Sequence, residues 1–110
     1  MNLTFIETAL FSRFRAEHIS DDVYRALQNE LLENPEKGDI VKGLNGVRKI
    51  RIPDTQRNKG KRGGIRTMYF YYTTRSHIYF LFAYGKNETE DLTTEQRKAV
   101  NALLELIKTK

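Results

Sequence analysis

IRTMYFYY (Ile65–Tyr72) and IYFLFAYG (Ile78–Gly85) are two runs of aromatic and β-branched residues that lie close together in the chain. Residues of these types favour buried β-strands, because their side chains pack well on a pleated surface. The polar TTRS (Thr73–Ser76) after the first run fits a hairpin loop. We therefore predict an antiparallel hairpin at the centre of a sheet.

Three further segments predict the rest of the sheet. VRKIRI (Val47–Ile52) alternates between its two faces, as a strand with one solvent-exposed face does. NLTFIE (Asn2–Glu7) predicts a first strand. Ile40–Val41 lies between two turn segments and predicts a minor strand.

Three segments carry helical signals. TALFSRFRAEH (Thr8–His18) predicts a short helix with its apolar residues on one face. Ser20 is a good N-cap for a second helix, which we expect to end at Asn34, because a residue before proline avoids the α region. Thr93 and Gln96 form a capping box that predicts the start of a C-terminal helix.

The predicted order is strand, helix, helix, three strands and a final helix, with the minor strand before the three. This order indicates an α+β domain with a mostly antiparallel sheet, two N-terminal helices and one C-terminal helix. A chain of 110 residues fits one core. We therefore predict a single domain over residues 1–110.

The charge is concentrated in one segment. From Lys42 to Arg66 there are nine Lys or Arg and one acid, Asp54, so this segment is +8 and leaves −3 of the total charge of +5. Within it, NKGKRGGIR (Asn58–Arg66) holds four cations, three glycines and no acid. A mildly acidic body with one dense basic segment predicts a polyanionic partner.

The composition argues against several other kinds of site. There is no cysteine, and the two histidines, His18 and His77, have no ligand spacing to an acid, so we predict neither a metal nor a cofactor. No apolar run approaches the roughly 20 residues of a membrane span. The N-terminus has no basic region and carries Glu7 in its apolar part, which is not typical of a signal peptide. We expect a cytoplasmic protein.

RNA can be cleaved without a metal ion if an enzyme supplies a base for the 2′-OH, cations for the phosphate and an acid for the leaving oxygen. Arginine neutralises phosphate through its fork of donors, and crowded cations lower the pKa of a lysine enough for it to act as a base. Five cations are expected at one edge of the sheet: Lys59, Lys61, Arg62, Arg66 and Lys86. The same cluster would also hold a phosphate without cutting it, so composition leaves catalysis and plain binding open.

Three longer stretches carry a resemblance to a known family. GLNGVRKIRI (43–52), GKRGGIRTMYFYY (60–72) and FLFAYGKNETEDLTTEQRKAV (80–100) resemble the RelE/ParE superfamily of bacterial toxins, and the HigB subgroup most closely. The resemblance covers nearly the whole chain. It implies a RelE-like, microbial-RNase-like fold and the activity of a ribosome-dependent mRNA endonuclease, or mRNA interferase.

The resemblance also implies roles for residues. A loop lysine, Lys59 or Lys61, would be the base, Arg66 and Lys86 would stabilise phosphate charge, and Tyr84 is a candidate acid. RelE itself uses a tyrosine near its C-terminus, whereas no aromatic residue follows Tyr84 here. The residues expected to hold RNA or the ribosome are Arg48, Lys49, Arg51, Arg57, Arg62 and Asn87. Because Arg66 begins a strand rather than filling a core, we expect Arg66→Ala to lower activity far more than stability.

The implied partners are a HigA-like helix-turn-helix antitoxin, mRNA and the A site of the small ribosomal subunit, with the free toxin monomeric and no membrane partner. Two alternatives stay open. A ParE-like toxin would poison gyrase, although the basic loop suits RNA better than a protein target. A nucleic-acid-binding module would hold RNA without cutting it.

Overall fold

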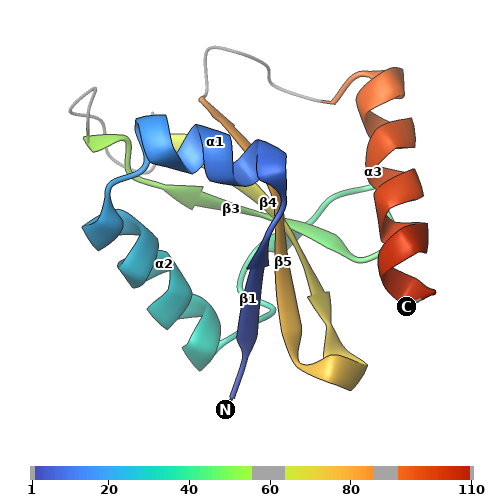
Figure 1. Ribbon diagram of the computed structural model, residues 1–110, viewed down its shortest axis with the longest axis horizontal. Helices are drawn as coiled ribbons and strands as arrows, with labels where there is room; N and C mark the ends of the chain where they lie inside the picture. The colour runs from blue at the N-terminus through green and yellow to red at the C-terminus, as the bar shows by residue number, and fades with distance from the viewer. Residues whose placement is uncertain (1, 56–63, 86–91, 110) are drawn as a thin grey trace.

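The protein is described by a computed structural model that covers residues 2–55, 64–85 and 92–109 (Figure 1). Its regular elements follow the predicted order and the α+β class is confirmed. They are β1 (Thr4–Glu7), α1 (Ala9–His18), α2 (Asp21–Glu33), β2 (Asp39–Ile40), β3 (Val47–Ile52), β4 (Ile65–Tyr72), a 3₁₀ turn (Thr73–Arg75), β5 (His77–Gly85) and α3 (Thr94–Lys108).

The strands form one five-stranded sheet in the order β1-β5-β4-β3-β2. The predicted hairpin of β4 and β5 lies in its interior, and only the β1–β5 pair is parallel. The minor strand β2 begins one residue earlier than predicted and pairs only Asp39 with Lys49 and Ile40 with Arg48. No helix in the described part of the chain is both long and apolar enough to cross a membrane.

Helices α1 and α2 cover one face of the sheet and α3 covers the other, so the protein has two cores (Figure 1). The core beneath α1 and α2 contains Phe11, Tyr24, Leu27, Leu31, Ile50, Ile52, Ile65, Tyr69, Ile78 and Phe80. The core beneath α3 contains Leu44, Val47, Met68, Phe70, Leu81, Tyr84, Val100, Leu104 and Ile107. The two lists show which face each strand residue occupies.

A β-bulge in β5 changes which side chains face α3. Met68 pairs with Phe82 but Tyr69 pairs with Phe80, so Leu81 is an additional residue on β5. Strict alternation from Phe80 would direct Tyr84 toward α1 and α2, because successive strand residues point to opposite faces. The additional residue shifts the alternation, so the residues after it point to the opposite face, and Tyr84 joins the core beneath α3.

The turn before β2 is held by the buried Tyr69. Its hydroxyl donates a hydrogen bond of 2.8 Å to the Pro35 carbonyl and accepts one of 2.9 Å from the Gly38 N–H. Burial raises the pKa of Tyr69. A Cβ at position 38 would lie 2.8 Å from the Tyr69 ring, so this close approach requires glycine. The turn before β2 is therefore held closely against β3 and β4.

Candidate nucleic-acid interface

Three predicted site residues form a row across the three central strands, at the end where β3 and β5 finish and β4 begins. Arg51 on β3 pairs with Arg66 on β4, and Arg66 pairs in turn with Tyr84 on β5. All three lie on the face that α3 partly covers, since their flanking strand residues, Ile50 and Ile52 among them, belong to the opposite core. Folding therefore places two arginines and a tyrosine side by side on neighbouring strands.

The pairing of Arg51 with Arg66 brings their side chains close. The Val47 carbonyl accepts a hydrogen bond from the Val41 N–H, and the Val47 N–H donates one to the Leu44 carbonyl. Both bonds lie on the side of β3 away from β4. Successive residues of a strand direct their N–H and C=O groups to opposite sides, so Arg51, four residues after Val47, also directs these groups away from β4. Arg51 and Arg66 are then a non-hydrogen-bonded pair, the kind whose Cα atoms lie about 4.5 Å apart and whose side chains approach most closely. Like charges directly opposite each other on neighbouring strands destabilise a sheet.

Arg66 is more buried than the sequence predicted. Only 9% of its surface is exposed, and its Nη1 donates a hydrogen bond of 3.2 Å to the Gly64 carbonyl. The expectation that Arg66 lies outside the core is wrong, since the strand that begins here is already covered. A substitution that removes the guanidinium therefore affects packing as well as charge.

Tyr84 is buried next to Arg66. It is 5% exposed, and its ring stacks on that of Phe82 with centroids 6.0 Å apart. Its position in the row fits the predicted role near the scissile phosphate, whereas its burial fits packing beneath α3. A role as general acid stays a prediction.

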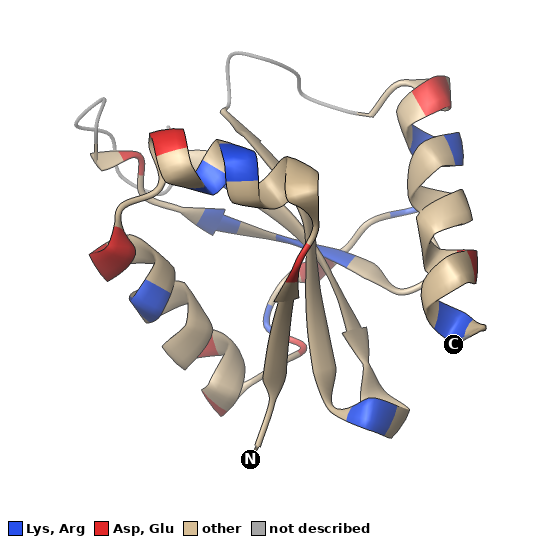
Figure 2. Cartoon of the chain, in the orientation of Figure 1, with Lys and Arg blue, Asp and Glu red and all other residues tan. Residues whose placement is uncertain are grey.

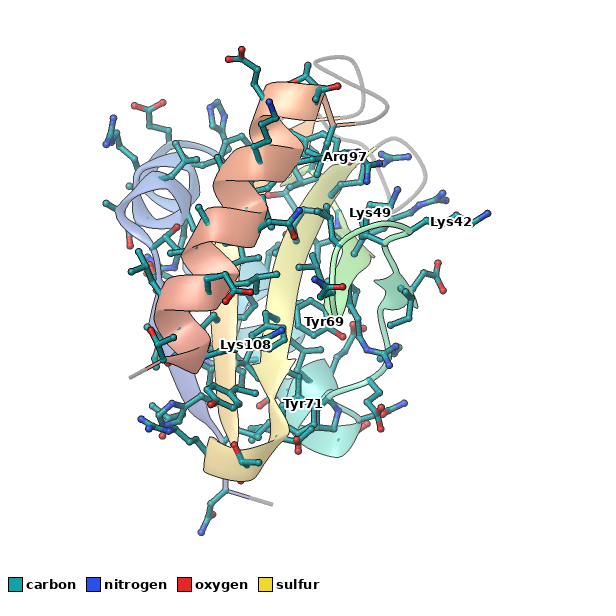
Figure 3. All side chains as sticks on the ribbon, turned by 90° about the vertical axis from the view of Figure 1, so that its right-hand side faces the viewer. Lys42, Lys49, Tyr69, Tyr71, Arg97 and Lys108 are labelled. Carbon is teal, nitrogen blue, oxygen red and sulfur yellow. The ribbon has the colours of Figure 1, made fainter. Side chains whose placement is uncertain are left out.

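Lys49 extends the row along β3, and two further cations lie near it. The Arg97 Nη1 donates a hydrogen bond of 2.7 Å to the Lys42 carbonyl, which joins α3 to the segment before β3. Figure 3 shows Lys42, Lys49 and Arg97 together beside α3. Neither Lys42 nor Arg97 was expected in the site, because a contact between distant segments of the chain brings Arg97 to the basic face.

Arg48 does not belong to this group. It lies on the opposite face, and its Nη1 donates hydrogen bonds of 2.9 and 2.8 Å to the carbonyls of Glu36 and Gly38. An ion pair of 3.3 Å with the Glu36 carboxylate completes these contacts. Arg48 therefore holds the turn before β2, and a contact between Arg48 and RNA stays a prediction.

Six predicted site residues lie outside the described residues: Arg57, Lys59, Lys61, Arg62, Lys86 and Asn87. Their segments nevertheless attach to the site. Gly64 directly precedes β4, and the last β5 residue, Gly85, pairs with Ile65. Both segments therefore connect to the sheet one residue beyond the row of Arg51, Arg66 and Tyr84.

Charge is distributed unevenly over the described surface. Figure 2 shows cations along β3, whereas α1 and α2 carry both signs. The two histidines lie elsewhere: the His18 ring packs on Phe14 with centroids 4.5 Å apart, and the His77 Nδ1 lies 3.5 Å from the Tyr79 hydroxyl. The described residues thus place the basic surface along β3, with the buried Arg66 of β4 next to it.

This fold and basic face agree with a comparison against known families. The family model described as the RelE toxin of the RelE/RelB toxin–antitoxin system matches residues 4–109. The match includes every strand and helix, from β1 to α3. Toxins of this family pair with an antitoxin and are generally endoribonucleases. The chain therefore belongs to the RelE family of toxins of toxin–antitoxin systems.

Proposed function

We propose that this toxin is a ribosome-dependent mRNA endonuclease that cuts mRNA in the ribosomal A site by attack of the 2′-OH, without a metal ion. We further propose that it is HigB-like, acts in the cytoplasm and is neutralised by a HigA-like helix-turn-helix antitoxin. The observation that carries the proposal is the opposition of Arg51 and Arg66 on β3 and β4. Two guanidinium groups on neighbouring strands offer two planar forks of donors to a phosphate.

The scissile phosphate would bind to this pair. Arg66 is held in place by burial and by its bond to the Gly64 carbonyl, so its fork is pre-organised. Arg51 is exposed and can close on the phosphate from the β3 side. Two guanidinium groups neutralise the charge that grows on the non-bridging oxygens in the transition state, which is the largest electrostatic demand of the reaction.

Proton transfer would come from residues at the same end of the strands. Lys59 or Lys61 takes the proton of the 2′-OH, and the 2′-oxygen bonds to phosphorus as the bond to the 5′-oxygen breaks. The 5′-oxygen leaves with a proton supplied by Lys86 or Tyr84. The products are a 2′,3′-cyclic phosphate and a 5′-hydroxyl, and no water, oxidant or second substrate is consumed.

Dependence on the ribosome follows from the kind of contacts available. Guanidinium and ammonium groups bind phosphates of any sequence and do not orient a particular 2′-OH for in-line attack. The ribosome would supply that orientation by holding the mRNA in the A site. Efficient cutting of free RNA by the purified protein would contradict this part of the proposal.

The test maps mRNA 5′ ends in growing cells after brief expression of the wild type, Arg51→Ala and a control, Arg25→Ala. Arg51 and Arg25 are both exposed, but Arg25 lies on α2, away from the row. Cuts confined to translated frames, lost in Arg51→Ala and kept in Arg25→Ala, are expected. Growth arrest without cuts would favour gyrase poisoning, and neither arrest nor cuts would favour a binding module.

A further inference from the structure

Helix α3 carries a second apolar stripe, on a side that does not face the sheet. The stripe consists of Ala99, Ala102 and Leu106, which recur at helical spacing and are all exposed. Leu106 is 61% exposed. The residues that dock α3 on the sheet lie on another side of the helix. Figure 3 shows α3 in front of the sheet, with none of the described helices or strands over its outer side.

An open groove lies next to this stripe, between α3 and the start of α1. Its volume is about 180 Å³, and its lining is apolar except at Thr8 and Gln96. Ala99 and Leu103 line it from α3, and Leu10, which is 59% exposed, lines it from α1. Because Ala99 belongs to both the stripe and the groove, the two form one apolar surface. Contiguous exposed apolar surface of this kind marks an interaction site.

We propose that this surface binds a second copy of the chain, so that two α3 helices pack antiparallel about a two-fold axis near Ala102. The stripe provides a large exposed side chain at Leu106 and a small one at Ala99, seven residues earlier. About an axis near Ala102, Leu106 of each copy lies opposite Ala99 of the other, and so enters the groove beside it. The small alanine side chains allow the two helices to approach closely.

The charges beside the stripe fit the same axis. Lys98 and Glu105 are exposed, and within the described part of the chain neither forms an ion pair. They are also seven residues apart and centred near Ala102, so the antiparallel arrangement brings Lys98 of each copy beside Glu105 of the other. A parallel arrangement would bring each of these charges against its own copy. Exposed ion pairs add little affinity but select the orientation.

Self-complementarity is the reason for choosing a second copy as the occupant. The large side chain, the space that it fills and both members of each ion pair all lie on α3 or beside it, arranged about one centre. A partner of unrelated sequence would not require such a match within α3 itself. The resemblance to RelE/ParE toxins implies a monomeric free toxin, so the proposal departs from that expectation.

The proposed contact lies away from the basic surface. Arg97 donates to the Lys42 carbonyl on the side of α3 that faces the segment before β3, whereas the groove lies on the side that faces α1. Association of two copies therefore does not depend on the proposed nuclease activity. A test that reads association alone keeps the failure of one proposal apart from the failure of the other.

The test measures the mass of the purified protein by sedimentation equilibrium at concentrations up to about 0.5 mM, because a contact built on one helix is small and therefore weak. A reversible equilibrium between monomer and dimer is expected. Leu106→Gln should lower the association constant at least tenfold, whereas Ile40→Gln, the same kind of change at a residue of β2 that is 59% exposed, should leave it unchanged. A monomer at every concentration, or a dimer of unchanged affinity in Leu106→Gln, would overturn the proposal.

Exchange of charges tests the antiparallel arrangement. Lys98→Glu and Glu105→Lys each bring like charges together across the axis, and each is expected to weaken association severalfold. The variant with both substitutions restores opposite charges and should associate as the wild type does. Association that is weakened as much in the double variant as in the single variants would overturn the arrangement.

An introduced thiol reports the position of the axis, because the chain contains no cysteine. Ala102→Cys should give a covalent dimer with a short bifunctional thiol reagent, whereas Ala16→Cys, at an exposed position of α1, should not. Equal crosslinking of both variants would show that the copies meet elsewhere. A wild-type protein that is monomeric alone, together with loss of antitoxin binding in Leu106→Gln, would assign the stripe to the antitoxin and overturn the proposal.

Discussion

The Thr8 hydroxyl donates a hydrogen bond of 2.6 Å to the Leu81 carbonyl and so connects the start of α1 to the bulge of β5. The same oxygen accepts the Phe11 N–H at 3.1 Å, as an N-cap does. One side chain thus caps a helix and satisfies a carbonyl at the bulge. Because this bulge turns Tyr84 toward α3, Thr8 supports the row of Arg51, Arg66 and Tyr84 from the far side of the sheet.

Replacing Thr8 by Val keeps the shape of the side chain and removes the hydroxyl. We expect the free energy of unfolding to fall by about 1–2 kcal/mol, because an N-cap and a second hydrogen bond are lost together. Urea unfolding measures this change. Thr8→Ser retains the hydroxyl and should stay within about 0.5 kcal/mol of the wild type, and a Ser variant as unstable as Val would point to lost packing instead.

Arg51→Ala should lower activity without lowering stability. Removing one of two opposed cations relieves repulsion, which is worth roughly 0.2–1 kcal/mol for a cross-strand pair. We therefore expect an unchanged or slightly raised free energy of unfolding, together with at least a tenfold loss of mRNA cuts. Urea unfolding and the 5′-end map provide the two readings. A destabilised variant would mean that Arg51 is held by contacts that offset the repulsion.

Arg66 should respond differently, because it is buried. Arg66→Ala removes packed methylenes as well as charge, and we expect a loss of about 1–3 kcal/mol in the free energy of unfolding. Arg66→Lys keeps a cation but not the planar fork, so it should remain more stable than the Ala variant and still lose at least tenfold in activity. Full activity of Arg66→Lys would show that charge alone suffices there.

Tyr69→Phe tests the anchor of the turn before β2. The substitution leaves the Gly38 N–H and the Pro35 carbonyl without their buried partner, and we expect a cost of about 1–3 kcal/mol in the free energy of unfolding. Tyr71→Phe, two residues further along β4 and only half-buried, is the matched control and should change little. Equal effects of the two substitutions would argue against the hydrogen bonds as the cause.

Tyr24 and Tyr69 should ionise at higher pH than a free tyrosine. Burial raises the pKa of Tyr69, and burial together with the hydrogen bond of 2.8 Å to Glu7 raises the pKa of Tyr24. An unfolded tyrosine ionises near pH 10. The stability that these groups contribute is therefore complete below about pH 10 and is lost as the pH rises through their higher folded-state pKa values.

The tyrosinate absorbance of Tyr24 and Tyr69 should accordingly appear late, as the protein unfolds. Tyr24→Phe should reduce this late absorbance by one group. A single titration of all tyrosines near pH 10 in folded protein would contradict the raised pKa values.

Much of the fold could be predicted from local patterns. The aromatic runs of β4 and β5, the alternation of β3 and the caps at Ser20 and Thr93 each specify an element through its neighbours in the chain. The concentration of cations between Lys42 and Arg66 likewise predicts a polyanion-binding surface. These features depend on residues a few positions apart, so the sequence alone determined them.

Only the tertiary structure decided which cations share a face and which are already engaged. Arg48 and Arg51 look alike in the sequence, but the former binds the turn at Gly38 and the latter opposes Arg66. The face of Tyr84 depends on one additional residue in β5, whose carbonyl is satisfied by Thr8, 73 positions away. Contacts between distant segments set these outcomes, because they depend on register and burial, which local pattern does not specify.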